Sequence, residues 1–517
     1  MANKSLFGTL KEQTTTNAAG GSAYAMSAEH ALAQLAVTGC LNATFYTDAG
    51  DQLETILDLA QRARPEFVAK VALYARMRGH MKDAPALLVA ILSVTAPGLM
   101  AEVFDRVIDS PKMVRNFVQI MRSGQVARRS LGSLPKRLVE QWLERRSDAQ
   151  VFRASVGGSP SLVDVIRMVH PKPATSSRSA LYAYLLGRGF TEADLPEIVK
   201  QYEAFKHNPG AFAGEKVPDV PMELLTSLHL SKRHWAAMAR RVSWQTLRMN
   251  LNTFTRHGAF ESKEDIAHAA ARLRDRELIA GARVFPFQLL SAFVNAGDTV
   301  PMDLLDALQD AMEIATERVP AIRGDVWVLT DVSGSMDAPV TGHRAGSTTK
   351  VRCVDVAALI AASVMRTSRG ARVLAFSDDV VPVRLNARDT VMTNAKALAS
   401  LPRGGTNCSA PLRAINDAGH RADVVIFVSD NESWIDSRGA GRSTATVVEW
   451  ERLKKRCPGA KLVCIDIQPN TTTQARSGTD VLNVGGFSDA VFGVVSTFLE
   501  SPSHPEHWIR EIEKESI

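Results

Sequence analysis

The stretch GDVWVLTDVSGSM, residues 324–336, marks a change in the pattern of the chain. It is an apolar, β-rich run that ends in small polar residues, which is typical of a buried strand followed by a loop. After it, strand-like runs at 371–377, 422–430 and 460–469 alternate with helical stretches near 350–366, 393–401, 410–418, 444–456 and 489–499. This alternation predicts βαβ units around a buried parallel sheet, and therefore a doubly wound α/β domain over residues 321–517.

Small polar residues follow three of the predicted strand positions, at the sheet edge where open α/β sheets bind ligands. Asp331, Ser333 and Ser335 lie in the first loop, Thr406 in a Gly-rich second loop, and Asp430 in a third. Two carboxylates and three hydroxyls are hard oxygen ligands, which suit Mg²⁺ or another divalent cation better than zinc or copper. Two alternatives stay open: these residues only form turns, or they hold a structural metal that binds no partner.

The order D-x-S-x-S, then Thr, then Asp resembles the metal-ion-dependent adhesion site of von Willebrand A domains, and all five positions match. The resemblance implies that Ser333 and Ser335 contact the metal directly and that Thr406 does so directly or through water. Asp331 and Asp430 would act mostly through water, and the open position would accept a carboxylate from a partner. A hydrolase that uses these five residues is an alternative. We expect no enzyme, because the chain has neither a His partner for a nucleophile elbow nor a phosphate-binding loop.

Upstream of this domain, from about residue 27 to 318, the pattern is helical almost throughout. In PEFVAKVALYARMRG, residues 65–79, apolar positions recur at helical spacing after a proline in the first turn. Starts that resemble capping boxes recur at Asp51…Glu54, Ser161…Asp164, Thr191…Asp194 and Ser262…Asp265. Without a strict period, the region predicts degenerate, HEAT-like helix pairs in an all-α domain over residues 27–320. Residues 1–26 are predicted to form a flexible leader.

The bulk composition indicates a multidomain globular protein. The chain has 517 residues, of which 45% are hydrophobic and 22% charged, and a net charge of +6. It contains no apolar run of the roughly 18 residues that a membrane-spanning helix needs and no signal-peptide pattern, so we expect a cytoplasmic protein without a membrane partner. The scattered cysteines favour reduced thiols over a zinc module or a disulfide framework. They are Cys40, Cys353, Cys408, Cys457 and Cys464.

Two segments of the helical region are strongly basic. Between residues 112 and 146 basic residues greatly outnumber acidic ones, and residues 226–260 contain no acid at all. Such clusters attract RNA phosphates because each neutralised phosphate releases counterions. A solvated basic face is the alternative for either segment.

Several motifs resemble the Ro (TROVE-domain) ribonucleoproteins. In SLVDVIRMVHPKP, residues 161–173, an apolar helix ends in His170 before Pro-Lys-Pro. The basic segment 112–143 and RVFPFQLLSAF, residues 283–293, resemble further blocks of that domain, while GGTNCSAPL and SDNESW resemble the Thr and Asp loops of the Ro von Willebrand A domain. The likeness covers nearly the whole chain. It implies a bacterial-type Ro protein, monomeric, whose helical repeats form a ring closed by the α/β domain.

The resemblance also implies what the protein binds. In that family single-stranded 3′ ends of misfolded non-coding RNAs enter a central hole, structured Y RNA binds the basic outer surface, and an exoribonuclease is an associated protein. His170 matches the family's histidine that contributes to Y RNA binding and Arg153 matches a basic contact, whereas Gly157 replaces a second one. The expected RNA contacts are Arg128, Arg129, Lys136, Arg137, Arg153, His170, Lys172, Lys232 and Arg233. The alternative function is a metal-dependent protein-binding adaptor whose basic helices are incidental.

Overall fold

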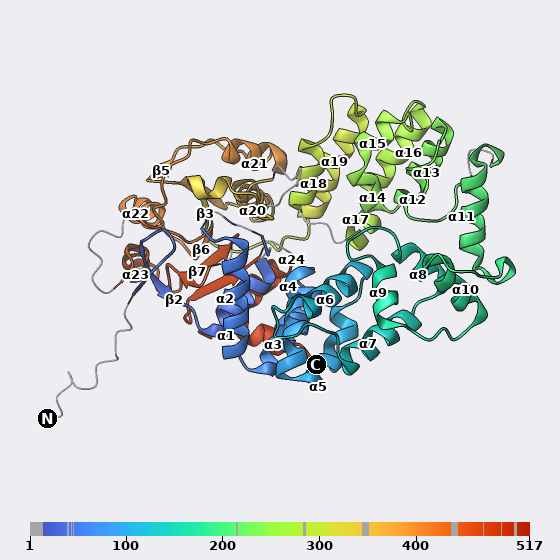
Figure 1. Cartoon of the computed structure of the whole chain (residues 1–517). Coiled ribbons are helices and arrows are strands. Elements are labelled where there is room, and N and C mark those ends of the chain that lie inside the picture. The colour runs from blue at the N-terminus through green and yellow to red at the C-terminus, as the bar shows by residue number, and fades with distance from the viewer. Residues whose placement is uncertain are drawn as a thin grey trace. The chain divides into compact units, whose positions relative to one another are not determined.

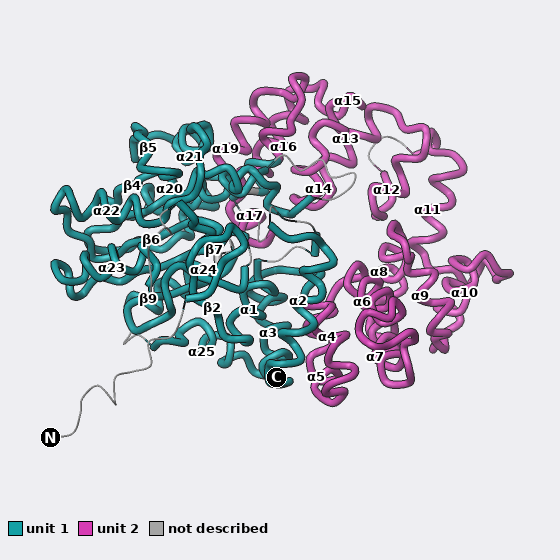
Figure 2. Tube along the Cα trace, turned by 60° about the vertical axis from the view of Figure 1, so that its left-hand side comes forward, with its two compact units in different colours: residues 1–84, 285–291, 312–516 teal, residues 85–284, 292–311, 517 magenta. Residues whose placement is uncertain are grey.

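The computed structural model describes residues 14–517 except 39–40, 43, 45, 213–215, 283–285, 344–350, 436–442, 469, 487–488 and 501–503. The chain divides into two compact units (Figure 2). Unit 1 contains residues 1–84, 285–291 and 312–516, and unit 2 contains residues 85–284, 292–311 and 517. This division differs from the boundary predicted at residue 320, because the first helices of the chain group with the α/β domain.

Unit 1 is built around a six-stranded sheet, whose strands β3, β6 and β7 are labelled in Figure 1. The strand order is β5-β4-β3-β6-β7-β9. Its strands are β3 (Val326–Asp331), β4 (Arg372–Phe376), β5 (Val380–Val381), β6 (Val424–Ser429), β7 (Lys461–Asp466) and β9 (Val481–Gly485). Only β5 pairs antiparallel among these strands. Every residue of β3 and β6 is buried, as expected for central strands with helices on both faces of the sheet.

The connecting helices confirm the predicted α/β alternation. They are α20 (Cys353–Thr367), α21 (Val391–Ala399), α22 (Ser409–Asp417), α23 (Ala445–Arg456) and α24 (Asp489–Glu500). On one sheet face Trp327 and Phe427 form a buried cluster with Leu412 of α22 and Trp450 of α23. The pattern missed β9 and the last helix, α25 (His507–Glu513), which are short. Residues 350 and 469, at the ends of a predicted helix and a predicted strand, lie outside the described residues.

The expectation of a flexible leader is wrong for residues 14–26. Strand β2 (Ser22–Ala25) pairs with β1 (Thr15–Thr16) on one side and with β8 (Thr472–Thr473) on the other. The buried Asn17 stabilises the β1–β2 turn, since its Nδ2 donates to Ser433 O at 2.8 Å and its Oδ1 accepts from Gly21 N at 2.6 Å. These strands are made of small and polar residues and depend on a distant partner strand, so they have no hydrophobic period. Residues 1–13 lie outside the described residues.

Three further helices complete unit 1: α1 (Ala28–Thr38), α2 (Ala49–Arg62) and α3 (Pro65–Met77). Helix α25 packs against α1 and α3, and Arg64 joins them, with its Nε 2.8 Å from Glu29 Oε1 and its Nη2 2.6 Å from Glu513 Oε1. Helix α3 begins at Pro65 as predicted. Helix α2 begins earlier than the predicted Asp51 start, because Asp48 is its N-cap and accepts from the backbone N–H of residues 50 and 51.

His30 of α1 is buried in the contact between α1, β9 and α25. Its Nε2 lies 3.1 Å from Asn483 O, and its ring meets Trp508 edge to face with centroids 5.4 Å apart. Desolvation lowers the pKa of His30 to about 4, whereas an exposed histidine in the unfolded chain has a pKa of about 6.5. The folded state therefore binds fewer protons than the unfolded state between these two values.

From this shift we predict a loss of stability in acid. The free energy of unfolding should fall as the pH drops from about 6.5 to 4, with His30 contributing up to ~3 kcal/mol of the change. His30→Gln removes the titrating ring, so the stability difference between wild type and variant should shrink over this pH range. Urea denaturation at several pH values measures it. A difference that stays constant with pH would contradict the prediction.

The regular secondary structure of unit 2 is entirely helical among its described residues. Its elements are α5 (Pro97–Val107), α6 (Pro111–Ser123), α7 (Ser133–Glu144), α8 (Asp148–Ala154), α9 (Leu162–Val169), α10 (Ser176–Leu185), η1 (Glu192–Asp194), α11 (Glu197–His207), α12 (Met222–Leu225), α13 (Lys232–Arg241), α14 (Trp244–Met249), α15 (Leu251–Arg256), α16 (Lys263–Arg274) and α17 (Arg276–Ala282). Helices α4 (Asp83–Thr95), α18 (Pro286–Val294) and α19 (Met302–Thr316) cross the unit limits. The predicted helical-repeat body is confirmed.

Two of the predicted capping sites are confirmed in unit 2. Ser161 forms a capping box with Asp164, and Ser262 accepts from Asp265 N at 3.0 Å. Thr191 begins only the 3₁₀ turn η1, and its side chain makes no cap hydrogen bond there. A serine before an apolar periodic stretch was thus a reliable helix start in this chain.

Two expectations about the whole chain concern membranes and thiols. Over the described residues, every helix is too short or too polar to cross a bilayer. Cys353, Cys408, Cys457 and Cys464 are buried free thiols, while Cys40 lies outside the described residues. The described cysteines thus match the expected reduced state.

Candidate metal site and basic surface

The three predicted loops of the metal site meet beside the carboxyl ends of β3 and β6. Asp331 is the last residue of β3, and Asp430 directly follows β6. These strands are neighbours, and the chain leaves them in opposite directions along the sheet, from β3 to β4 and from β6 to β7. Such a change of direction is the topological switch point at which doubly wound sheets bind ligands.

Hydrogen bonds fix the orientation of the five predicted residues, each of which is at most 5% exposed. Ser333 N donates to Asp331 Oδ1 at 2.8 Å, and the hydroxyls of Ser333 and Ser335 lie 3.2 Å apart. Gly334 N donates to the backbone oxygen of residue 404 at 2.9 Å, which joins the first loop to the Thr406 loop. The acid and the two hydroxyls of D-x-S-x-S are therefore held together, as the motif predicts.

The Thr406 loop requires its two glycines. A Cβ on Gly404 would collide with the carboxylate of Asp378, and one on Gly405 would lie 2.5 Å from Ile435 Cδ1. Asp378 Oδ1 also accepts from Gly405 N at 3.0 Å. The glycines thus allow the close backbone approach that brings Thr406 beside the other two loops.

The electrostatics of the cluster fit a divalent cation. Burial and the neighbouring carboxylate of Asp430 raise the pKa of Asp331 to about 7, and burial raises the pKa of Asp430. Asp430 Oδ2 is buried and has no hydrogen-bond partner among the described residues. An unpaired buried carboxylate oxygen is costly, and a cation would satisfy it.

The composition of the cluster decides which cation fits. The described residues contain no group of three or more His, Cys, Asp or Glu side chains placed to hold a metal. A cation here would therefore depend on the hydroxyls of Ser333, Ser335 and Thr406 together with Asp331 and Asp430. This all-oxygen set with few charges suits Mg²⁺, which keeps several of its waters.

Sequence reasoning missed two side chains of this site. Ser429 Oγ donates to Asp331 Oδ2 at 2.5 Å, and its place before Asp430 in SDNESW was a signal that could have identified it. Tyr46 hydrogen-bonds Ser335, and burial and the carboxylate of Asp430 raise the pKa of Tyr46. Tyr46 lies between α1 and α2, so no local pattern connects it with the metal motif.

Helix ends that carry several of the predicted RNA contacts lie close together in unit 2. Helix α9 packs against α6 and α7, and Arg122 Nη1 lies 2.9 Å from Met168 Sδ, so the C-terminal ends of α6 and α9 meet. The start of α7 lies there too. Gly132, just before α7, lies against the guanidinium of Arg128. Arg128 donates to Ser93 O at 2.7 Å, and the Ser93 hydroxyl in turn contacts Met121 Sδ of α6 at 3.4 Å.

We call this region the basic end of unit 2. It comprises Arg122, Arg129, Lys136, Arg137, His170 and Lys172, all of them exposed except the half-buried Lys136. His170 is the C-cap of α9 with φ +52°, and its N–H donates to Ile166 O at 2.9 Å. This left-handed conformation before Pro171 ends the helix. The basic end therefore presents several basic side chains to solvent.

The other predicted contacts differ from these. Arg128 is half-buried and tied to Ser93, Arg153 pairs with Asp219 at 2.6 Å, and Lys232 pairs with Glu261 at 2.5 Å. Arg233 is exposed on α13, which packs against α15 and α16. Five of the nine predicted residues thus lie at or near the adjoining helix ends of the basic end, and the role of all nine in RNA binding stays a prediction.

The fold and the site define a class of protein: a helical-repeat body joined to a von Willebrand A domain with an adhesion-type cluster. Residues 326–499 match the family model of the Ro60 vWA domain. The RNA-binding protein RO60 of Deinococcus radiodurans is 25% identical, covering 95% of this chain and 96% of that protein. The RNA-binding protein RO60 of Caenorhabditis elegans is 24% identical over 48% of this chain and 39% of its own length.

A solved structure is similar along most of the chain as well. The crystal structure of the Deinococcus radiodurans Ro (RSR) protein matches with a TM-score of 0.62 and 22% identity, over 92% of this chain and 99% of that one. Residues 326–499 are therefore a Ro60-type von Willebrand A domain, and the whole chain is similar to Ro proteins in sequence and fold. The family resemblance inferred from the motifs is confirmed.

Proposed function

We propose that this chain binds non-coding RNA. In this proposal the basic end of unit 2 holds structured RNA such as a Y RNA, and a single-stranded 3′ end of a misfolded RNA enters a central channel of a monomeric ring. Two proteins that are similar to this chain in sequence are named RNA-binding proteins, which supports RNA as the ligand. The proposal is for a binding protein in the cytoplasm rather than for an enzyme.

The observation that carries the proposal is the exposure of the basic end. Within the described part of the chain, Arg129 and Arg137 make no side-chain hydrogen bond or ion pair, so their charges face solvent. Exposed guanidinium groups suit bidentate contacts to phosphate. Backbone charge then supplies most of the affinity, and we expect weak sequence preference and a strong dependence on salt.

The metal cluster has a separate role in the proposal. A Mg²⁺ ion, or another divalent cation, would be held by Asp331, Ser333, Ser335, Thr406 and Asp430 and would offer an open position to an acidic side chain of a protein partner. Trp434 lies beside this cluster, because its backbone N donates to Thr406 O at 3.1 Å, and the residue is 45% exposed. An exposed tryptophan is a common centre of protein–protein contacts. An exoribonuclease is the partner that we propose.

The proposal is tested by titrating the full-length chain with a labelled RNA hairpin that carries a single-stranded 3′ tail, over a salt series. We expect the logarithm of affinity to fall linearly with the logarithm of salt, with a slope of about −3 to −6 for five or so phosphate contacts. A nearly flat salt dependence would leave the basic end without a function in RNA binding. Duplex DNA of equal length serves as the control for general polyanion binding.

A further inference from the structure

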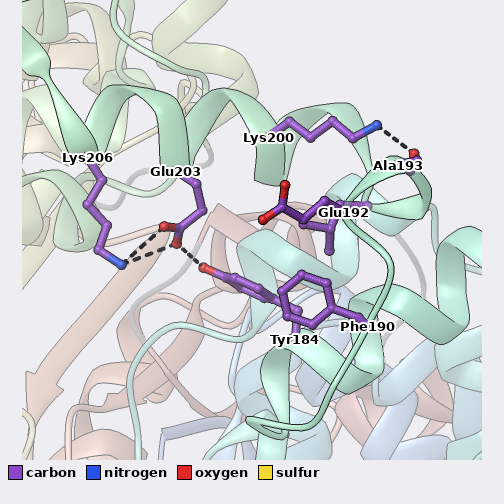
Figure 3. Close-up of a pocket in the computed structure, with 8 residues that line it drawn as sticks. Tyr184, Phe190, Glu192, Ala193, Lys200, Glu203 and Lys206 are labelled. Atoms are coloured by element: carbon purple, nitrogen blue, oxygen red, sulfur yellow. Dashed lines mark hydrogen bonds and ion pairs between the residues drawn. The ribbon is translucent and has the colours of Figure 1, made fainter.

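A second candidate site lies in unit 2, where α10, η1 and α11 border a pocket of about 820 Å³ (Figure 3). A pocket of this volume is large enough for a small organic ligand. It is lined by Tyr184, Phe190, Glu192, Ala193, Leu195, Lys200, Glu203 and Lys206. None of these residues was among the predicted RNA contacts.

The chain presents Phe190 to this pocket through a defined helix end. Gly187 N donates to Tyr184 O and Arg188 N donates to Ala183 O, at 3.2 and 2.8 Å, which together form a Schellman motif after α10. Gly187 has φ +68°, the left-handed conformation that this motif requires. The chain then turns away from the helix, and Phe190 remains 40% exposed. A large apolar ring is thus held at the surface.

Aromatic packing and hydrogen bonds hold Tyr184 in place, and the Phe190 ring packs against it. Phe190 meets Tyr184 edge to face with centroids 5.8 Å apart, and Phe152 also meets Tyr184 edge to face, at 6.2 Å. The Tyr184 hydroxyl donates to Glu203 Oε1 at 2.5 Å, and the same carboxylate accepts from Lys206 Nζ at 3.2 Å. The platform therefore exists before a ligand binds, which lowers the entropy cost of binding.

Charged groups surround the exposed ring. Glu192 lines the same pocket, and no hydrogen bond or ion pair to its carboxylate is found among the residues that the structure describes. Lys200 Nζ donates to Ala193 O at 2.7 Å, and Lys206 pairs with Glu203 (Figure 3). Each ammonium group has three donors, so both lysines keep donors for a further acceptor such as a phosphate.

We propose that this pocket binds one guanine base of single-stranded RNA, stacked on Phe190 and held by Glu192. The inference rests on the proposed RNA-binding function and adds a base preference to it. Among the four bases, guanine alone presents two adjacent donors, N1–H and N2–H, which match the two oxygens of one carboxylate. Adenine and cytosine place an acceptor next to their amino group, and uracil places an acceptor on each side of its single donor.

The charges of the pocket argue against an apolar peptide side chain as the ligand. An aliphatic or aromatic side chain would cover Phe190 but would leave Glu192 desolvated without a donor, which is costly. A guanine base would stack on Phe190 and donate hydrogen bonds to Glu192, and Lys200 and Lys206 can neutralise the charge of its phosphate. Unpaired bases of single strands are recognised in this way, by stacking combined with hydrogen bonds to the base edge.

The test compares two labelled ten-nucleotide RNAs, oligouridine and the same strand with one central guanosine, by fluorescence anisotropy on the full-length chain. We expect the guanosine strand to bind about tenfold tighter to the wild type. Phe190→Ala should weaken its binding by about tenfold or more, and Phe190→Trp should retain it. Glu192→Gln should reduce the preference for guanosine to near one, because it removes the carboxylate that accepts from both N1–H and N2–H.

The controls separate this inference from the general one. Met249→Ala, which removes another apolar side chain of unit 2 that is 67% exposed, should leave both affinities unchanged. Equal binding of the two strands by wild type, or no effect of Phe190→Ala, would overturn the base pocket even if RNA still binds with steep salt dependence. Guanosine monophosphate that competes for the pocket, without any preference between the strands, would overturn RNA as the source of the base. Absence of all RNA binding in the salt series would instead overturn the proposed function.

Discussion

The double variant Arg129→Glu/Arg137→Glu should bind the tailed RNA hairpin roughly 100-fold more weakly than wild type at about 0.1 M salt. Each substitution removes a cation that faces solvent and places an anion where a phosphate would lie. The slope of log affinity against log salt should also become less negative, by about 0.7 to 0.9 for each phosphate that the variant no longer neutralises. Anisotropy titrations at four or five salt concentrations measure both quantities.

The matched control is Arg369→Glu/Arg388→Glu. These arginines are exposed in unit 1, and their side chains have no partner within the described residues, so the change of net charge is the same. We expect only a small decrease in affinity from this pair, because its charges lie outside the basic end. Equal decreases from the two double variants would show that net charge, and not the basic end, governs binding. Thermal melts should be unchanged for both, since exposed positions seldom affect stability by more than about 0.5 kcal/mol.

The second large effect concerns Mg²⁺. A cation bound at the proposed adhesion-type site would stabilise the folded state by mass action, by about 2.7 kcal/mol when its concentration is 100 times its Kd. We therefore expect millimolar Mg²⁺ to raise the melting temperature of wild type by several degrees relative to protein in EDTA. Asp430→Asn should abolish this increase, because it removes a charge from the site and nearly preserves the size of the side chain. Scanning calorimetry with and without Mg²⁺ measures the shift.

Two further measurements would show whether the Mg²⁺ shift arises at the adhesion-type site. Without metal, Asp430→Asn should be no less stable than wild type. Burial and mutual repulsion destabilise the Asp331 and Asp430 carboxylates when both are charged, and the variant removes one of the two charges. Asp379→Asn changes an exposed carboxylate just after β4 and should keep the full Mg²⁺ shift. A shift that survives in Asp430→Asn would mean that Mg²⁺ acts elsewhere on the protein.

The sequence predicted the parts of the fold that depend on continuous local patterns. Strands β3 and β6 begin as unbroken apolar runs because both of their faces are buried, and the D-x-S-x-S and SDNESW motifs start at their last residues, Asp331 and Ser429. The short strands β1, β2 and β8 could not be predicted, since they consist of a few polar residues whose pairing depends on segments far apart in the chain. For the same reason Tyr46 escaped notice beside Ser335.

The candidate RNA contacts show a different limit. Arg128 and Arg129 are adjacent and chemically identical, yet one is tied to Ser93 and the other faces solvent. Composition locates a basic cluster but does not separate cations that support the fold from cations that are free to bind. Phe190 shows that a candidate binding residue can also lack any sequence signal. It is a single aromatic residue in a glycine-rich turn, and only the structure places it at a pocket.

The central claim is that this chain binds structured RNA with a free single-stranded 3′ end. The affinity ratio between the tailed hairpin and the same hairpin with a blunt end, measured in competition on wild type at about 0.15 M salt, tests it most directly. We expect the tailed RNA to bind at least about tenfold tighter, because the tail adds backbone charge and stacking contacts. A ratio near one, with weak binding of both RNAs, would contradict the claim and favour a metal-dependent adaptor of protein partners.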